Sequence, residues 1–176
     1  MRRARLEDVP TLQRWDREPA VIRCTTDDPE ANVAFEGHDW HEAIANQSDI
    51  DYHLIAEVDG RPIGAMQIID PHLEPTHYWG DIEPNLRALD IWIGESDARG
   101  KGYGEQMMRQ ALRSCFADAH VIAIVIDPLA SNTRAHTFYE RLGFVIIDRR
   151  LFHDEDDCYV MRLTREAWRE RFSGDD

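Results

Sequence analysis

A glycine-rich segment, Arg99 to Gly104, constrains the fold of this chain more than any other. It follows an apolar run, Leu89 to Ile93, and it precedes residues 105–116, where apolar side chains recur with a helical period. A strand, a glycine-rich turn and a helix start can cradle a phosphate, because bare N–H groups point outward and the helix N-terminus carries about half a positive charge. The segment therefore predicts a phosphate site, and it holds Lys101, the only lysine of the chain.

Length and composition indicate one globular domain over residues 1–176. Hydrophobic residues make up 43% of the chain, and no apolar run approaches the roughly 20 residues that a membrane span needs. The basic start, Met1 to Arg5, is followed by charged and polar residues where a secretory peptide has an apolar core. We therefore expect a cytoplasmic protein with no membrane partner.

Cysteine usage and charge argue against several other classes of protein. Cys24, Cys115 and Cys158 are odd in number and form no CxxC pair, so we expect no disulfide framework and no zinc site. His72 and His77 also lack metal-site spacing. The formal net charge of -14 argues against nucleic acid as a partner and suits a cationic substrate, although a general effect on solubility explains it equally well.

The hydrophobic pattern alternates strands with helices, which is typical of an α/β (α+β) protein. Residues 52–58 and 62–69 predict a hairpin around the turn Asp59-Gly60, and Asp8 and Asn132 stand where helix N-caps belong. The other expected elements are strands at 2–6, 87–93, 121–126, 144–151 and 158–163, helices at 105–116 and 165–172, one or two short helices within 31–46, a loop at 70–84 and an acidic turn at 153–157. Pro19 and Pro29 interrupt residues 18–46, and we expect the acidic tip of residues 25–28 to be exposed.

Three phosphate-binding patterns compete for the glycine-rich segment. A P-loop needs Ser or Thr after its lysine, but Gly102 follows Lys101. A dinucleotide fingerprint needs a third glycine where Glu105 stands. The third pattern is Arg or Gln, two residues, Gly, one residue, and then Gly or Ala, and Arg99, Gly102 and Gly104 fit it. In this they resemble the coenzyme A pyrophosphate loop of the GNAT superfamily of N-acetyltransferases. The alternative is a glycine-rich turn before an ordinary helix.

A second stretch adds to this resemblance. After a helix start at Asn132 the chain has Phe138-Tyr139-Glu140 and then Gly143-Phe144, which is similar to the downstream GNAT signature, and the spacing leaves room for one helix and one strand. The resemblance covers about residues 57–162. It implies the GNAT acyl-CoA N-acyltransferase fold, a central, mixed, mostly antiparallel sheet that is flanked by helices and whose strands splay apart at the cofactor site.

Several shorter motifs narrow the resemblance: Pro62-Ile63-Gly64, Arg87-Ala88-Leu89-Asp90, Asp127-Pro128, Ser131-Asn132 with Arg134-Ala135, and Tyr78-Trp79 with Glu83-Pro84. Together they resemble motifs of the aminoglycoside 6'-N-acetyltransferases. A sister group with related motifs acylates hydroxylysine-type amines in siderophore assembly, so that group stays an alternative.

The resemblance implies that acetyl-CoA (coenzyme A) is the co-substrate. Backbone N–H groups of residues 100–105 would hold the pyrophosphate, and N–H groups of the splayed strand would face the thioester. The predicted cofactor residues are Ile91, Trp92, Ile93, Arg99, Gly100, Lys101, Gly102, Tyr103, Gly104, Glu105, Asn132, His136 and Tyr139. Asn132 serves equally well as an N-cap, and His136 fits a solvated helix position equally well.

Two residues are candidates for the chemistry, which the resemblance implies is direct attack in a ternary complex. Asp90 interrupts an apolar strand on the face that it shares with Trp92, and it would accept the amine proton, directly or through water, or hold the substrate ammonium. A salt bridge to Arg87 is the alternative. Tyr139 would donate a proton to the departing thiolate, or else it packs in the core. No cysteine stands in a nucleophile context.

The acceptor is expected at Tyr78, Trp79, Glu83, Asp90 and Asp127. The rings would form a wall for a sugar and the carboxylates would attract a cation, with a solvated acidic turn as the alternative. The sequence thus predicts an N-acetyltransferase, monomeric or homodimeric, for a primary amine of a small cationic acceptor such as the 6'-amine of an aminoglycoside, which would confer antibiotic resistance. Alternatives are a siderophore-type or protein N-acyltransferase and a non-catalytic coenzyme A binding module.

Overall fold

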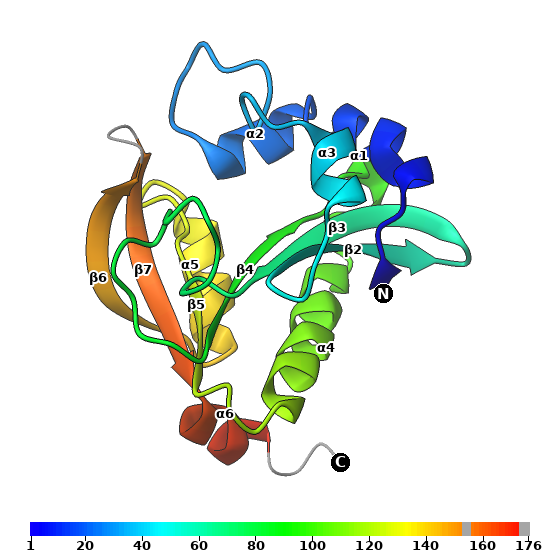
Figure 1. Ribbon diagram of the computed structural model, residues 1–176. Helices are drawn as coiled ribbons and strands as arrows, with labels where there is room; N and C mark the ends of the chain where they lie inside the picture. Colours follow the sequence, from blue (N-terminus) through cyan, green and yellow to red (C-terminus); the bar gives the residue numbers. More distant parts are fainter. Residues whose placement is uncertain (153–155, 173–176) are drawn as a thin grey trace.

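The computed structural model describes residues 1–152 and 156–172, which form one seven-stranded sheet with helices on both faces (Figure 1). The strands are β1 (Arg2–Arg3), β2 (Asp51–Val58), β3 (Arg61–Ile69), β4 (Leu86–Trp92), β5 (Ala123–Ile126), β6 (Val145–Phe152) and β7 (Asp156–Thr164). The helices are α1 (Val9–Trp15), α2 (Pro19–Thr25), α3 (Trp40–Ala45), α4 (Tyr103–Ala117), α5 (Thr133–Arg141) and α6 (Arg165–Phe172). Within those residues no helix combines the length and the apolar character that crossing a bilayer requires.

The sheet has the order β1-β2-β3-β4-β5-β7-β6. Five of its neighbouring pairs run antiparallel, and β4 with β5 is the single parallel pair in the described sheet. The β2–β3 hairpin turns at Asp59 and Gly60, which both have positive φ, as the predicted turn requires. The expected mixed, mostly antiparallel sheet is therefore confirmed.

The two central strands β4 and β5 diverge along their length. Their ladder runs from Leu86 opposite Ala123 to Ala88 opposite Val125 and then stops, although β4 continues to Trp92. Figure 1 shows β4 leaning away from β5 beyond this point. The edge of residues 89–92 that would face β5 therefore has no strand partner, and the expected splay is confirmed.

The side chains of β4 contribute to three apolar clusters. Leu89 joins the largest cluster, which packs under α4. On the opposite face, Trp92 belongs to the cluster beneath α1 and α3, whereas Ala88 belongs to the cluster around Trp79. Asp90 stands between Ala88 and Trp92 on that face and is exposed to solvent. The fold therefore leaves an opening at Asp90, between two packed clusters.

The N-terminal quarter differs most from the sequence expectations. Helix α2 begins at Pro19, a residue that we read as an interruption, because proline is well suited to the first helical turn. Asp8 stands at the N-cap position of α1 without capping it, since its carboxylate accepts the Arg5 N–H at 2.8 Å and pairs with Arg2 at 2.7 Å. Strand β1 ends at Arg3. Most of the expected turn at 153–157 lies outside the described residues.

Arg165→Met should destabilise the fold. The Arg165 guanidinium is buried and donates to the carbonyls of Val121 (2.7 Å), Phe116 (2.8 Å) and Asp118, which lie at and just after the end of α4. Losing these charged hydrogen bonds should cost about 3 kcal/mol of unfolding free energy, or roughly 10 °C in Tm. Thermal unfolding followed by circular dichroism measures this. Arg113→Met, at an exposed position of α4, is the control, and equal Tm values for both variants would contradict the assignment.

Candidate active site

The glycine-rich loop forms an open backbone cradle at the start of α4. Gly100 and Gly102 have φ values of 73° and 82°, which favour glycine, and a Cβ added at either would meet no other atom within 4 Å. The Gln106 N–H is the first to bond back into the helix, to the Gly102 carbonyl at 3.2 Å. The N–H groups of residues 103–105 have no acceptor within the helix. Donors and open space at a helix N-terminus fit a pyrophosphate.

The two cations of this loop have different surroundings. Lys101 is exposed and has no ion pair with the described residues. Arg99 instead points back toward the end of β4, where its Nε donates to the Ile93 carbonyl at 3.0 Å and its Nη2 donates to the Gly94 carbonyl at 2.7 Å. Its Nη2 also pairs with Glu18 at 3.0 Å. Lys101 is thus the cation that is free for a phosphate.

The Asp90 carboxylate has no basic partner among the described residues. The alternative salt bridge is not formed, because Arg87 pairs with Asp70 at 3.0 Å and lies 3.7 Å from Asp118. Water reaches the Asp90 side chain, yet protein surrounds the position on its other sides. This partial desolvation, with the charge of nearby Asp127, raises the pKa of Asp90 to about 7. The group is therefore poised to exchange a proton near neutral pH.

Asp127, just after β5, forms the opposite side of the opening. The Tyr78 hydroxyl donates to the Asp127 carboxylate at 2.5 Å, and the Tyr78 ring stacks on Phe152 with centroids 4.6 Å apart. Burial raises the pKa of Asp127 to about 6, although the hydrogen bond from Tyr78 opposes the shift. The loop of residues 70–85 thus supplies the Tyr78 ring, and the end of β5 supplies the Asp127 carboxylate, across from Asp90.

Tyr139 on α5 has a buried ring and an unpaired hydroxyl. The residue is 9% exposed, and its ring packs edge-on against Phe144 in the main core. Its hydroxyl has no hydrogen bond to the described residues. Burial, with the charges of Asp90 and Asp127, raises the pKa of Tyr139 well above its usual range, so the hydroxyl stays protonated. The ring thus has the core position and the hydroxyl is available as a proton donor.

Several predicted residues have other partners in the structure. Trp79 is 3% exposed and packs against Tyr78 and Phe152, so its ring supports the wall from behind. Glu83 pairs with Arg162 at 2.5 Å on the outside of the sheet.

On α5, Asn132 caps the helix by accepting the Ala135 N–H at 3.1 Å, which leaves its NH₂ group free. The His136 Nε2 lies 2.8 Å from the Leu129 carbonyl. Ile91 and Ile93 pack against the main core, so only their backbone can serve a ligand.

Two features of the site escaped the sequence reasoning. Gln67 lies directly opposite Asp90 on β3 and donates to Asp51 at 2.8 Å, which adds another carboxylate to this face of the sheet. The register between β3 and β4 places Gln67 beside Asp90, but the long loop between the two strands keeps this register from being read in the sequence.

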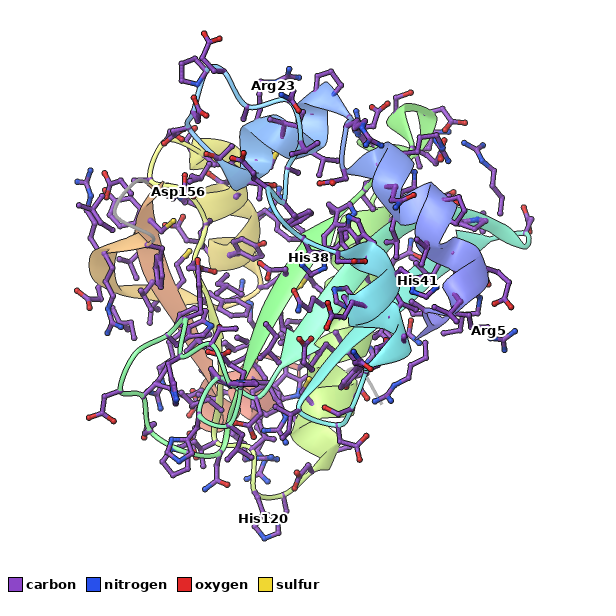
Figure 2. All side chains as sticks on the ribbon, turned by 45° about the horizontal axis from the view of Figure 1, so that its top comes forward. Arg5, Arg23, His38, His41, His120 and Asp156 are labelled. Carbon is purple, nitrogen blue, oxygen red and sulfur yellow. The ribbon has the colours of Figure 1, made fainter. Side chains whose placement is uncertain are left out.

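The other feature is a bridge formed by the segment after α2, which reaches the far side of the splay. There the Thr26 hydroxyl donates to Asp156 at 3.0 Å, and the Ser131 hydroxyl donates to Asp27 at 2.6 Å. Figure 2 shows this segment near the labelled Asp156. We read this acidic tip only as exposed, because its partners are far away in the sequence.

The surroundings of Asp90 are open to solvent. Two surface hollows in the described part lie away from Asp90, one lined by residues of the loop 72–82 and one lined by α2 and the segment that follows it. No group of three or more His, Cys, Asp or Glu side chains in that part is arranged to hold a metal ion. The site can therefore bind through backbone donors, a lysine and carboxylates.

Asp90→Asn should raise Tm at about pH 8. The folded pKa of Asp90, about 7, lies above the ordinary 3.8, so ionised Asp90 destabilises the fold. This cost grows as pH rises from about 4 to 7 and is complete above that range. Thermal scans across this range measure the effect. Asp148→Asn is the control and should lower Tm, because its carboxylate pairs with Arg150 at 2.7 Å. A lower Tm for Asp90→Asn would identify a structural ion pair instead.

Sequence comparisons identify the family of the chain. Residues 5–151 match the family described as acetyltransferase (GNAT) domain. An aminoglycoside N(6')-acetyltransferase type 1 of Klebsiella pneumoniae is 32% identical over 102 residues, which are 57% of this chain and 50% of that protein. A kanamycin resistance protein of Rhizobium radiobacter is 34% identical over 73 residues, which are 41% of this chain and 68% of that protein. The chain spans about half the length of the first of these relatives.

Solved structures agree with this result. The aminoglycoside acetyltransferase AAC(6')-Ib in complex with coenzyme A has a TM-score of 0.81 and 25% identity, with 98% of each chain covered. The same enzyme with ribostamycin and coenzyme A has a TM-score of 0.82 and 25% identity, covering 99% of this chain and 97% of that one. An aminoglycoside N(6')-acetyltransferase of Legionella pneumophila, at 23% identity with 97% and 94% covered, shares the fold with a TM-score of 0.73. The chain therefore belongs to the GNAT acetyltransferase family.

Proposed function

We propose that the protein transfers an acetyl group from acetyl-CoA to a primary amine of a small cationic acceptor. The observation that carries the proposal is the placement of Asp90, which has no basic partner among the described residues and lies on the splayed part of β4, ten residues before the open backbone of Gly100. A proton acceptor and a pyrophosphate cradle thus lie on one continuous segment. This arrangement suits direct attack of the amine on a bound thioester.

The donor side rests mainly on backbone groups. The N–H groups of residues 100–105 and the exposed Lys101 would bind the pyrophosphate. The unpartnered edge of residues 89–92 would offer N–H groups to the acetyl carbonyl as negative charge develops on its oxygen. Such a donor is worth up to about 4 kcal/mol in known enzymes. The free NH₂ group of Asn132 is available to the pantetheine arm.

Proton transfer is divided between Asp90 and Tyr139. Asp90, with a pKa of about 7, takes the proton of the acceptor ammonium, directly or through a water, and frees the nitrogen lone pair. As the C–N bond forms and the C–S bond breaks, the Tyr139 hydroxyl donates its proton toward the departing thiolate. The free hydroxyl supports this second role, and the raised pKa keeps the proton on Tyr139 until the thiolate forms.

The acceptor side points to a compound with several positive charges. Asp127 and Asp51 both lie near enough to Asp90 to raise its pKa, and no Lys or Arg of the described residues pairs with Asp90 or Asp127. The Tyr78 ring stands beside them. Solved relatives are described with kanamycin, ribostamycin and paromomycin. We therefore propose the 6'-amine of an aminoglycoside as the acceptor, and resistance to such antibiotics as the effect.

A panel of amines tests this function. We expect thiol release from acetyl-CoA with kanamycin or ribostamycin, and little release with hydroxylysine or a lysine peptide. Asp90→Asn should lower kcat/KM by about 100-fold or more while acetyl-CoA still binds in calorimetry. Wild-type kcat/KM should rise with pH to a plateau above about 7, and the variant should lose this inflection.

The control for Asp90→Asn is Asp148→Asn, on the edge strand β6. Its kcat/KM should match that of the wild type. Unchanged turnover in Asp90→Asn would remove Asp90 from the mechanism. Saturable acetyl-CoA binding without thiol release for any amine would instead support a non-catalytic binding module.

Tyr139→Phe should slow the reaction without unfolding the protein. Its hydroxyl has no partner in the described chain, so Tm should stay close to that of the wild type, while kcat should fall by about 10–100-fold. The loss should shrink with an acetyl thioester of an acidic thiol, which leaves without a proton. Stopped-flow or steady-state thiol release measures the rate with acetyl-CoA and with the thioester of the acidic thiol. Tyr159→Phe is the control, and an equal loss with both donors would contradict a role in protonation.

A further inference from the structure

The side chain of Arg99 is directed at protein backbone rather than at the glycine loop that it begins. Its Nε donates to the Ile93 carbonyl at 3.0 Å, and its Nη2 donates to the Gly94 carbonyl at 2.7 Å. On its other side the guanidinium pairs with Glu18 at 3.0 Å. Nη1 is left as the only guanidinium nitrogen without a described partner. Two backbone carbonyls and one carboxylate thus hold the guanidinium against one segment of backbone, and we call these three contacts the Arg99 clamp.

That segment follows β4 and lies beyond the ends of both of its ladders, although the Glu95 N–H still donates to the Ile63 carbonyl of β3 at 3.1 Å. The ladder with β5 ends at Ala88, and the ladder with β3 ends at Trp92. The carbonyls of Ile93 and Gly94 therefore lie outside both ladders and can accept hydrogen bonds from Arg99. Packing holds the segment from another side. A Cβ on Gly94 would come within 2.1 Å of the Trp15 indole, and the Trp15 Nε1 donates to Glu95 at 2.8 Å. The end of β4 is therefore held in one position by Arg99 and Trp15.

Glu18 connects this clamp to the acceptor side. It is the residue before α2, and the segment that follows α2 carries Thr26 and Asp27. Those two residues make the contacts with Asp156 and Ser131 across the splay. The short helix α2 thus joins the Arg99 clamp to the bridge across the splay. The position of the β4 end is tied to both halves of the site.

We propose that Arg99 is a positioning residue, fixed by Glu18, that holds the end of β4 where its backbone can serve the thioester. The proposal rests on the proposed function. The sequence predicted Arg99 as a phosphate ligand, whereas its contacts assign that task to Lys101 and the loop backbone. Misplacing reacting groups by about 1 Å can cost roughly 100-fold in rate, so the clamp bears on turnover without touching the donor.

Two donors separate the two roles. Acetyl-pantetheine carries the same thioester as acetyl-CoA but lacks the pyrophosphate and the nucleotide. Arg99→Gln should lower kcat by about 10–100-fold with both donors and by the same factor, while KM changes little. Lys101→Gln, the matched control, should raise KM for acetyl-CoA and leave acetyl-pantetheine unchanged. If Arg99→Gln follows the Lys101→Gln pattern, Arg99 is a phosphate ligand and the proposal is overturned.

Two further variants guard against simple unfolding. Glu18→Gln keeps Arg99 and its two carbonyl bonds but weakens the clamp, so kcat should fall by a few-fold with both donors while Tm stays near the wild-type value. Arg99→Lys keeps the charge and loses the planar fork, so it should not restore kcat. The double variant Glu18→Gln/Arg99→Gln should be no slower than Arg99→Gln alone. Full rescue by lysine, or additive losses, would overturn the proposal.

A binding measurement separates this inference from the proposed function. Coenzyme A is titrated into each variant by calorimetry, which needs no turnover. Arg99→Gln should bind coenzyme A within about 3-fold of the wild type, whereas Lys101→Gln should bind it about 10-fold more weakly. If no amine supports thiol release, the proposed function fails. If the wild type is active but Arg99→Gln loses coenzyme A affinity, the positioning role of Arg99 is contradicted while the proposed function stands.

Discussion

The divergence of β4 from β5 is the constraint on which the rest of the structure depends. Backbone N–H and C=O groups are costly to leave unpaired away from water, and a sheet normally satisfies them. Here the ladder stops at Ala88 and Val125, and one edge of β4 remains without a strand. The helices on both faces, the Trp15–Gly94 contact and the Arg99 hydrogen bonds hold the strand in this open position. Stability is thus supplied around the opening rather than within it.

Charge follows the same division between the rim and the opening. The chain has 34 acidic and 20 basic residues, and arginines pair with carboxylates around the periphery, as in Arg2–Asp8, Arg61–Asp97 and Arg149–Asp157. Asp90 and Asp127 have no such partner, and their pKa values are raised instead of lowered. Unpaired carboxylates cost stability, and a cationic ligand would compensate them. The site is therefore electrostatically incomplete until a cation arrives.

Local patterns in the sequence predicted local structure well. The glycine loop, the β2–β3 hairpin and helix α4 each depend on neighbouring residues, and the GNAT fold followed from two motifs in order. Sequence reasoning missed what depends on distant partners. Arg99 and Glu18 are 81 residues apart, and Ser131 and Asp27 are 104 apart, so no local rule distinguishes a ligand contact from an internal one. Pro19 was misread because proline both interrupts and begins helices.

The rarity of lysine has a chemical consequence for a protein of this family. An amine that loses its proton is a nucleophile toward thioesters, whereas an arginine guanidinium, with a pKa above about 12, is not. Apart from its terminus, the chain offers acetyl-CoA and other acylating reagents one side-chain amine, Lys101, on the exposed loop. Acylation of side-chain amines is thus confined to the cradle itself. The mass added to the protein by an acylating reagent at Lys101 would therefore report whether a bound ligand covers the loop.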